Sequence, residues 1–262
     1  MKRAATTQLD LDASSPATLI LSVAVADETA SENLTVTQAD VRLEPRVVLD
    51  QHGARLHVVE VAAGPVQVLY SVTKLGVMSA VEQSPVDEIR YLRPSRYCES
   101  DTLGAVARVE FQGLVGRELL AGVSSWVGQS LAYMPGSSQP TDGAVATLLS
   151  RRGVCRDYAH LVIAFLRALD VPARMASVYA PGLDPMDFHA VAEAYIDGEW
   201  YVVDATTLAP RSTLMRIATG RDASDTAFLS TRGGVVSLRK LLVSAVSDVL
   251  PGDDIFELVQ LS

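Results

Sequence analysis

The sequence predicts an α+β protein of two parts, a small antiparallel β-sandwich in residues 1–88 and a core of helices and strands in residues 89–262. From about residue 19 to residue 75 the chain consists of short alternating or β-branched runs between turn residues, whereas helical periodicity dominates after about residue 100. The 262 residues, 48% of them hydrophobic and 20% charged, are enough for two moderate domains with a buried core.

The first part contains five runs that are typical of strands. Between Leu19 and Leu75 they read LILSVAV, LTVTQADVRL, RVVLD, ARLHVVEVA and VQVLYSVTKL. Five strands at this spacing, without a helical period, favour an antiparallel sandwich. From Met78 to Pro94 the pattern weakens and prolines appear, which indicates the connection between the two parts.

Three helices are predicted before the centre of the core. Asp101 is a candidate cap for a helix that ends near Phe111. A second helix covers about Leu114–Leu131, and a short third one follows at Ala144–Ser150. Near the end of the chain, we favour a strand over Val235–Val246, although its composition fits a helix as well.

The core is organised around Gly153–Leu169, which reads GVCRDYAHLVIAFLRAL. A helix that is apolar nearly all round is a buried one, and this one would be about 22 Å long. Cys155 lies in its first turn, where free backbone N–H groups and the positive end of the helix dipole stabilise a thiolate. Cys155 is therefore the candidate nucleophile, although an unpaired cysteine is more often a small core residue.

The segment His189–Thr206, HAVAEAYIDGEWYVVDAT, predicts a hairpin that turns at Asp197-Gly198. With this turn, His189 and Asp204 become diagonal neighbours on one face of the hairpin. An aspartate that accepts one imidazole N–H leaves the other ring nitrogen free for a thiol. A three-residue loop would instead put the two residues on opposite faces, so the hypothesis depends on the register.

These segments resemble the transglutaminase-like superfamily. The resemblance lies in RRGVCRDYAHL, HAVAEAY and WYVVDATT and extends to RYLRPSRYCESD before them and GRDASDTAFL after them, most of residues 90–235. It implies a papain-like core in which Cys155 is the nucleophile, His189 the base and Asp204 the orienting acid. The first part is similar, more loosely, to the β-domain that precedes the core in bacterial transglutaminase-like proteins.

Two positions depart from the family pattern. Val191 stands where the family commonly has tryptophan, and Ala205 stands where a proline usually follows the aspartate. Both concern the pocket wall and the hairpin geometry, and therefore substrate and rate more than the triad. Glu193 shares the predicted face of His189 and either supports the triad or turns to solvent.

The chemistry implied by such a triad is acyl transfer through a thioester on Cys155. Water then completes the hydrolysis of a peptide or protein amide, whereas an amine completes a transamidation. The backbone N–H of Cys155 is one expected oxyanion donor, and Trp126 is a candidate for the second, although a tryptophan in an amphipathic helix is more often a core residue. The alternative function is a binding or scaffold module that keeps the fold without catalysis.

A metal site is disfavoured, and no cofactor is expected. Cys155 and His160 are five residues apart on one helix, so they lie about 140° apart around its axis and cannot bind one ion. Arg156 and Asp157 either orient substrate or brace the adjacent loop, and bracing is the commoner role for such a pair.

The net charge and the two cysteines restrict which partners and which cellular location we expect. The net charge is −9 with no basic run, which argues against nucleic acid and anionic membranes as partners. Apolar runs are shorter than a membrane span, and the start MKRAATTQLDLDASS lacks the apolar block of a signal peptide. We therefore predict a cytoplasmic protein in which Cys98 and Cys155 are reduced; the oligomeric state stays open.

Overall fold

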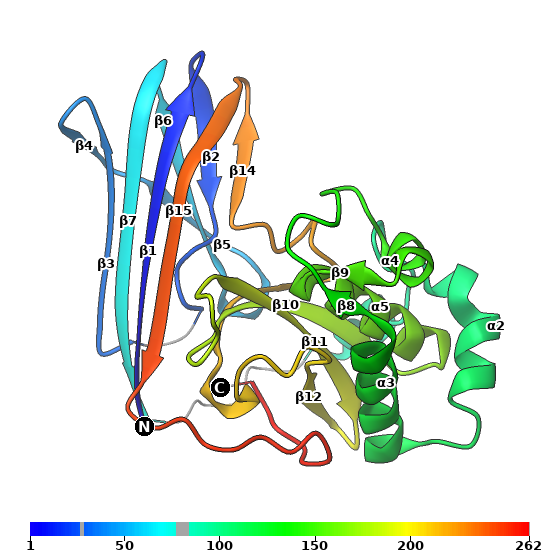
Figure 1. Cartoon of the computed structure of the whole chain (residues 1–262). Coiled ribbons are helices and arrows are strands. Elements are labelled where there is room, and N and C mark those ends of the chain that lie inside the picture. Colours follow the sequence, from blue (N-terminus) through cyan, green and yellow to red (C-terminus); the bar gives the residue numbers. More distant parts are fainter. Residues whose placement is uncertain (27–28, 77–83, 262) are drawn as a thin grey trace.

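The computed structural model describes residues 1–26, 29–76 and 84–261 (Figure 1). Two antiparallel sheets form its β-rich part. The first has the strand order β15 (Val236–Ser247), β1 (Lys2–Ala13), β7 (Gly64–Leu75), β3 (Ser31–Gln38) and β4 (Val41–Leu43). The second has the order β14 (Leu229–Arg232), β2 (Ala17–Leu21), β6 (Arg55–Val61) and β5 (Arg46–Leu49), and the short helix η1 (Gln51–Gly53) follows β5.

The two sheets share one hydrophobic core, as in a β-sandwich. Leu9 of β1 and Val68 of β7 belong to the same buried cluster as Leu19 of β2 and Val59 of β6. Along β1 and β7, buried positions alternate regularly with less buried ones, because successive strand side chains point to opposite faces. Each of the five predicted strand runs overlaps an observed strand.

Two features of the strand pairing were not expected from the sequence. The sequence reading assigned no strand to residues 2–13, yet β1 pairs with both β7 and β15. Strand β15 confirms the strand predicted for Val235–Val246, but it pairs with β1, and β14 pairs with β2. Residues 229–247, which the division at 88/89 placed with the core, thus hydrogen-bond to the sandwich. The division itself stays a prediction.

The predicted connection from Met78 to Pro94 is described only in part, because residues 77–83 lie outside the described ranges. The remainder contains helix α1 (Pro85–Arg90), which the sequence reading did not anticipate. Asp87 of this helix is buried and lies 3.4 Å from the ring of His52 in η1. Burial lowers the pKa of His52 to about 4, so its ring is neutral at pH 7, and the connection meets the sandwich at this contact without an ion pair.

The second part contains helices packed on a four-stranded sheet. Its helices are α2 (Ser100–Glu110), α3 (Gly116–Ser130), α4 (Ala144–Ser150) and α5 (Cys155–Ala168), with the 3-10 turn η2 (Arg211–Thr213). Its sheet has the order β12 (Glu199–Val203), β11 (Phe188–Ile196), β10 (Ala173–Tyr179) and β13 (Met215–Gly220), and a parallel pair joins β8 (Ala132–Tyr133) to β9 (Arg152–Gly153). The predicted helices are thereby confirmed.

Helix α5 is the centre of this part. Every residue from Asp157 to Arg167 is buried, as the sequence predicted for a helix apolar on nearly every face. It packs against α2, α3, α4 and strands β10 and β11 (Figure 1). None of the helices in the described ranges has the length and apolar character that crossing a bilayer requires.

The hairpin β11–β12 has the register that the sequence predicted. Ile196 pairs with Glu199, and the ladder continues to Ala192 opposite Val203. Asp197 and Gly198 form the turn with φ values of +52° and +87°, the left-handed conformations that a tight hairpin turn requires. Asp204 is the residue that follows the last paired residue of β12.

Candidate active site

Cys155 is the first residue of α5 and is half-buried. The carboxylate of Asp157 accepts a hydrogen bond from the N–H of Val154 at 2.8 Å, which closes the start of the helix. Gly153 is needed beside this contact, since a Cβ there would lie 2.6 Å from the Cβ of Asp157. The sequence RGVCRD therefore fixes where the sulfur enters the helix.

The charged pair beside the nucleophile braces a loop. Arg156 Nη2 bonds to Asp157 Oδ1 at 3.0 Å. The same nitrogen donates to Ser138 Oγ at 3.1 Å and to the carbonyl of Gln139 at 2.9 Å. These contacts tie the loop between β8 and α4 to the first turn of α5, which is the bracing role, the commoner of the two roles considered from the sequence.

His189 and Asp204 meet as the predicted register requires. His189 Nε2 and Asp204 Oδ2 are 2.8 Å apart, and both side chains are almost fully buried. Asp204 Oδ1 accepts hydrogen bonds from the N–H of Thr206 at 2.9 Å and from its hydroxyl at 2.7 Å. Ser124 of α3 donates to the Asp204 carbonyl at 3.3 Å, so the helix also holds this corner.

The other ring nitrogen of His189 is left free. Nδ1 is buried and has no hydrogen bond of ordinary length to any described residue. Burial lowers the pKa of His189, but the charge and hydrogen bond of Asp204 and the nearby thiol of Cys155 raise it to about 10. Conversely, burial raises the pKa of Asp204, while the charge of His189 and the Thr206 bonds hold it below its ordinary value.

The sulfur and the ring open onto one cavity of about 460 Å³, which we call the apolar pocket. Cys155 and His189 both line it. Most of its remaining wall is hydrocarbon, contributed chiefly by Met175, Phe188, Ile217, Ala223 and Phe228. A substrate carbonyl placed between sulfur and ring would therefore have an apolar recess beside it.

Tyr133 is a residue at this site that the sequence reading missed. Its strand β8 pairs with β9, which places Tyr133 opposite Gly153, two residues before the nucleophile. Burial raises the pKa of Tyr133, and a negative charge on the Cys155 sulfur raises it further. The backbone N–H of Cys155 lowers it through a hydrogen bond. The phenol thus lies beside both the sulfur and the first N–H of α5. Only the long-range β8–β9 pairing could have revealed this.

Contacts also decide the place of Trp126 and of Val191. Trp126 donates its indole N–H to Glu110 at 2.8 Å and packs against Phe165 in the core, so this N–H is engaged elsewhere. Val191 is buried in a separate cluster with Ala176 and Leu214 rather than in the wall of the apolar pocket, which corrects its predicted place.

Glu193 supports the sheet rather than the triad or the solvent. Its carboxylate accepts bonds from Arg174 Nε at 2.8 Å and from Arg216 Nη1 and Nη2 at 2.7 Å each. All three side chains are almost fully buried. Burial raises the pKa of Glu193, but the two guanidinium charges lower it far more.

One wall of the apolar pocket is the loop from Arg221 to Phe228. His160 of α5 accepts the N–H of Ala223 at 3.1 Å through Nε2, and burial lowers its pKa to about 4, so the ring is neutral. Asp222 is fully buried and accepts the N–H of Tyr97 at 3.0 Å. His160 therefore holds a loop, in agreement with the prediction that a neighbour satisfies it.

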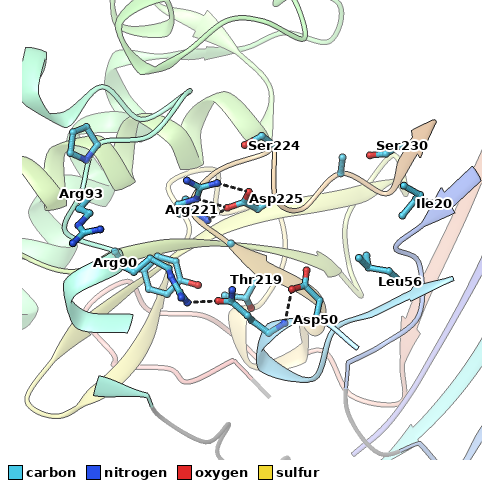
Figure 2. Close-up of a pocket in the computed structure, with 15 residues that line it drawn as sticks. Ile20, Asp50, Leu56, Arg90, Arg93, Thr219, Arg221, Ser224, Asp225 and Ser230 are labelled. Atoms are coloured by element: carbon cyan, nitrogen blue, oxygen red, sulfur yellow. Dashed lines mark hydrogen bonds and ion pairs between the residues drawn. The ribbon is translucent and has the colours of Figure 1, made fainter. Parts of the chain in front are cut away.

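A second cavity, of about 580 Å³, lies behind this loop (Figure 2). Ser224 and Ala227 line both cavities, so the loop is the partition between them. In Figure 2, Arg221 turns toward Asp225, with bonds of 2.8 and 3.0 Å between the two side chains. This ion pair holds the loop in place on the side of the second cavity.

Comparison with known proteins identifies the fold. A model of the transglutaminase-like superfamily core matches residues 116–205. The solved structure of a candidate cysteine protease from Cytophaga hutchinsonii is 33% identical, with a TM-score of 0.88, and the match covers 98% of this chain and 96% of that one. The chain belongs to the transglutaminase-like superfamily. The resemblance and the α+β fold with a β-rich domain are thereby confirmed.

Other matches cover less of this transglutaminase-like protein. An uncharacterised protein of Mycobacterium leprae (strain TN) is 27% identical over 164 residues, which are 59% of this chain and 57% of that protein. The chain thus matches little more than half the length of this curated relative. The periplasmic domain of TgpA from Pseudomonas aeruginosa is 18% identical, with a TM-score of 0.44, over 77% of this chain and 90% of that domain.

Proposed function

We propose that this transglutaminase-like protein is a cysteine hydrolase that cleaves an amide of a peptide or protein, with Cys155, His189 and Asp204 as its triad. The observation that carries the proposal is the 2.8 Å bond between His189 Nε2 and Asp204, which leaves Nδ1 free at a pocket that Cys155 also lines. The similarity to the candidate cysteine protease from Cytophaga hutchinsonii supports peptide or protein substrates.

In the first half of the reaction, one proton passes from Cys155 to His189 and then to the leaving amine. His189 Nδ1 takes the thiol proton of Cys155 and becomes an imidazolium that the Asp204 carboxylate stabilises. The thiolate attacks the amide carbon, and the carbonyl oxygen becomes an oxyanion. As the C–N bond breaks, Nδ1 returns its proton to the departing amine, which leaves a thioester on the sulfur.

The second half of the reaction decides between hydrolysis and transfer. Water, deprotonated by Nδ1, attacks the thioester, and the thiolate leaves with release of a carboxylic acid. An amine that attacks in place of water yields a new amide, so an amine-incorporating transglutaminase differs only in the second nucleophile. The raised pKa of His189 supports the imidazolium form in both halves.

In the proposed mechanism the oxyanion has two donors. One is the backbone N–H of Cys155, because the first N–H groups of a helix have no intrahelical acceptor. The other is the Tyr133 hydroxyl, whose pKa responds to both this N–H and the sulfur of Cys155. An oxyanion there would accept the phenolic proton, in the role that Trp126 cannot fill while it is bonded to Glu110.

A library of blocked peptides and peptide amides, followed by mass spectrometry, tests the proposal. The native protein should release an amine or ammonia from some members, and Cys155→Ala should release none. An added primary amine that is incorporated in competition with water identifies a transferase. Substrates that bind native protein and Cys155→Ala equally, without turnover by either, would instead identify a binding or scaffold module.

The proposal includes the cytoplasmic location predicted from the sequence. Both Cys98 and Cys155 are free thiols, and Cys98 is fully buried. Rapid alkylation of intact cells followed by fractionation tests this point. The protein should be recovered in the cytosolic fraction with Cys155 alkylated as a reduced thiol.

A further inference from the structure

Two serines that line the apolar pocket have hydroxyl groups without a hydrogen-bond partner among the described residues. Ser22, which directly follows β2, and Ser177, in β10, both line it. Both Oγ atoms are buried and have no hydrogen-bond partner among the described residues. Because buried hydroxyls are normally paired, two of them at one apolar recess point to a polar group supplied by a ligand.

Ser22 is held in place although its hydroxyl is unpaired. It is 3% exposed, and its backbone N–H donates to the carbonyl of Phe228 at 2.9 Å. Ser177 pairs with Ala190, the neighbour of His189, across the β10–β11 ladder. The two hydroxyls therefore come from different sheets, Ser22 from the sandwich and Ser177 from the core.

The walls favour an aromatic group. The rings of Phe188 and Phe228 are stacked, with centroids 5.0 Å apart and planes inclined by 24°. Phe188 directly precedes His189, so this pair lies next to the reacting centre. Flat aromatic walls about an apolar recess suit another ring better than a flexible chain, since rings pack in offset or edge contacts.

The charged groups of the pocket are already engaged. Arg156 is bonded to Asp157 and to the loop at Ser138, and His189 is bonded to Asp204. A lysine or an aspartate side chain would thus enter without an opposite charge to pair with, and an unpaired buried charge is strongly disfavoured. A neutral side chain with a hydrogen-bonding end meets no such penalty.

We propose, on the basis of the hydrolase function proposed above, that the apolar pocket is the specificity subsite for the acyl part of the substrate and takes a tyrosine side chain. The ring lies against Phe188 and Phe228, and the phenolic hydroxyl bonds to Ser22 and Ser177. The amino-terminal sandwich is then part of the active site, because Ser22 reads the end of the substrate side chain.

Irreversible thiol probes of one scaffold test this subsite. Blocked acyloxymethyl ketones that differ only in the side chain beside the ketone (Tyr, Phe, Leu, Lys or Asp) bond to the sulfur as their carboxylate leaves. The labelling rate of Cys155 is measured by intact mass. We expect the Tyr probe to react about tenfold faster than the Phe probe, and both to react faster than the Lys and Asp probes.

Serine-to-alanine variants test whether the two hydroxyls cause the preference for the Tyr probe. Ser22→Ala and Ser177→Ala should each reduce the ratio of Tyr to Phe labelling toward one, whereas Ser71→Ala, at an exposed position of β7 outside the pocket, should leave the ratio unchanged. Labelling of Cys155 at similar rates by all probes, or fastest by Lys or Asp, overturns the subsite and leaves the hydrolase intact. Labelling by none of the probes overturns both.

Discussion

Strand β11 contributes one residue to each of two buried clusters that contain a carboxylate. The clusters differ in the group that is bonded to the carboxylate. At the start of β11, His189 bonds to Asp204, and four residues further along Glu193 bonds to Arg174 and Arg216. Both carboxylates have lowered pKa values because cationic partners outweigh burial. Burial and charge pairing are therefore common to both clusters and do not distinguish a reactive site from a structural one.

The difference lies in the partner. The guanidinium groups beside Glu193 keep their protons at any physiological pH, so that cluster can only hold the sheet together. The imidazole of His189 can exchange a proton, and its Nδ1 remains unpaired at a pocket that contains a thiol. The candidate site is therefore marked by buried polar atoms that have no hydrogen-bond partner among the described residues, a property that the two serines of the apolar pocket share.

The largest effect on activity is expected from Asp204→Asn. The amide keeps the shape of the side chain but removes the charge that stabilises the imidazolium, so kcat/KM should fall about 10²–10⁴-fold. Steady-state kinetics on the best library substrate measures this. Glu193→Gln is the matched control, and per folded molecule it should lower kcat/KM far less. Equal losses in both variants would erase the distinction between the clusters.

For stability, the larger effect is expected at Glu193. Glu193→Gln leaves two buried guanidinium groups without their counter-charge, so the free energy of unfolding should fall by about 3–5 kcal/mol. The lowered pKa of Glu193 means that its stabilisation is present above its ordinary value of 4.5 and is lost as the pH falls through the folded value. Denaturant unfolding at pH 7 measures the loss; a change below about 0.5 kcal/mol would contradict the structural role.

Tyr133→Phe tests the second oxyanion donor. The ring and its contact with Tyr158, at 5.9 Å between centroids, are retained, while the hydroxyl is lost. We expect kcat to fall about 10²-fold with little change in KM, because the lost bond forms only as the oxyanion develops. Tyr158→Phe is the control, since its hydroxyl bonds to the carbonyl of Leu131 at 2.9 Å and not to substrate. Unchanged kcat in Tyr133→Phe would remove this residue from the mechanism.

The smallest effect is a shift of a pH limit. Burial lowers the pKa of His189, but Asp204 and Cys155 raise it to about 10, so the acid form that protonates the leaving amine persists through neutral pH. The activity should decline only as the pH approaches that value, and in Asp204→Asn this decline should move to lower pH.

The same pKa has a consequence for stability. A raised histidine pKa stabilises the fold fully below its ordinary value of 6.5, and this stabilisation is lost as the pH rises to about 10. The free energy of unfolding should therefore decrease over this range more steeply in the native protein than in Asp204→Asn. Parallel curves for the two proteins would show that Asp204 does not raise the pKa.

Features set by neighbouring residues were predictable from the sequence. The Asp197-Gly198 turn fixes the hairpin register, and the register alone brings His189 and Asp204 onto one face. The burial of α5 follows from its apolar faces. Both rest on local geometry, in which a period of two or of 3.6 residues decides which side chains share a surface.

Features set by long-range pairing were not predictable. Tyr133 reaches the site through a two-residue bridge to β9, and Ser22 reaches it because the sandwich packs against the core. Strand β1 was missed although its burial alternates, since its inward positions include Arg3, Ala5 and Thr7 as well as leucines. A sequence period signals a strand only weakly when small and polar residues occupy the buried face.

The most direct test of the central claim, that the sulfur of Cys155 and the ring of His189 act as one pair, is the rate at which a chloroacetamide alkylates Cys155, measured by peptide mass spectrometry. Buried Cys98 is the internal reference in the same molecule. We predict selective labelling of Cys155 in the native protein and a rate about 10²-fold lower in folded His189→Ala. Equal rates in the two proteins, or no preference for Cys155 over Cys98, would contradict the account.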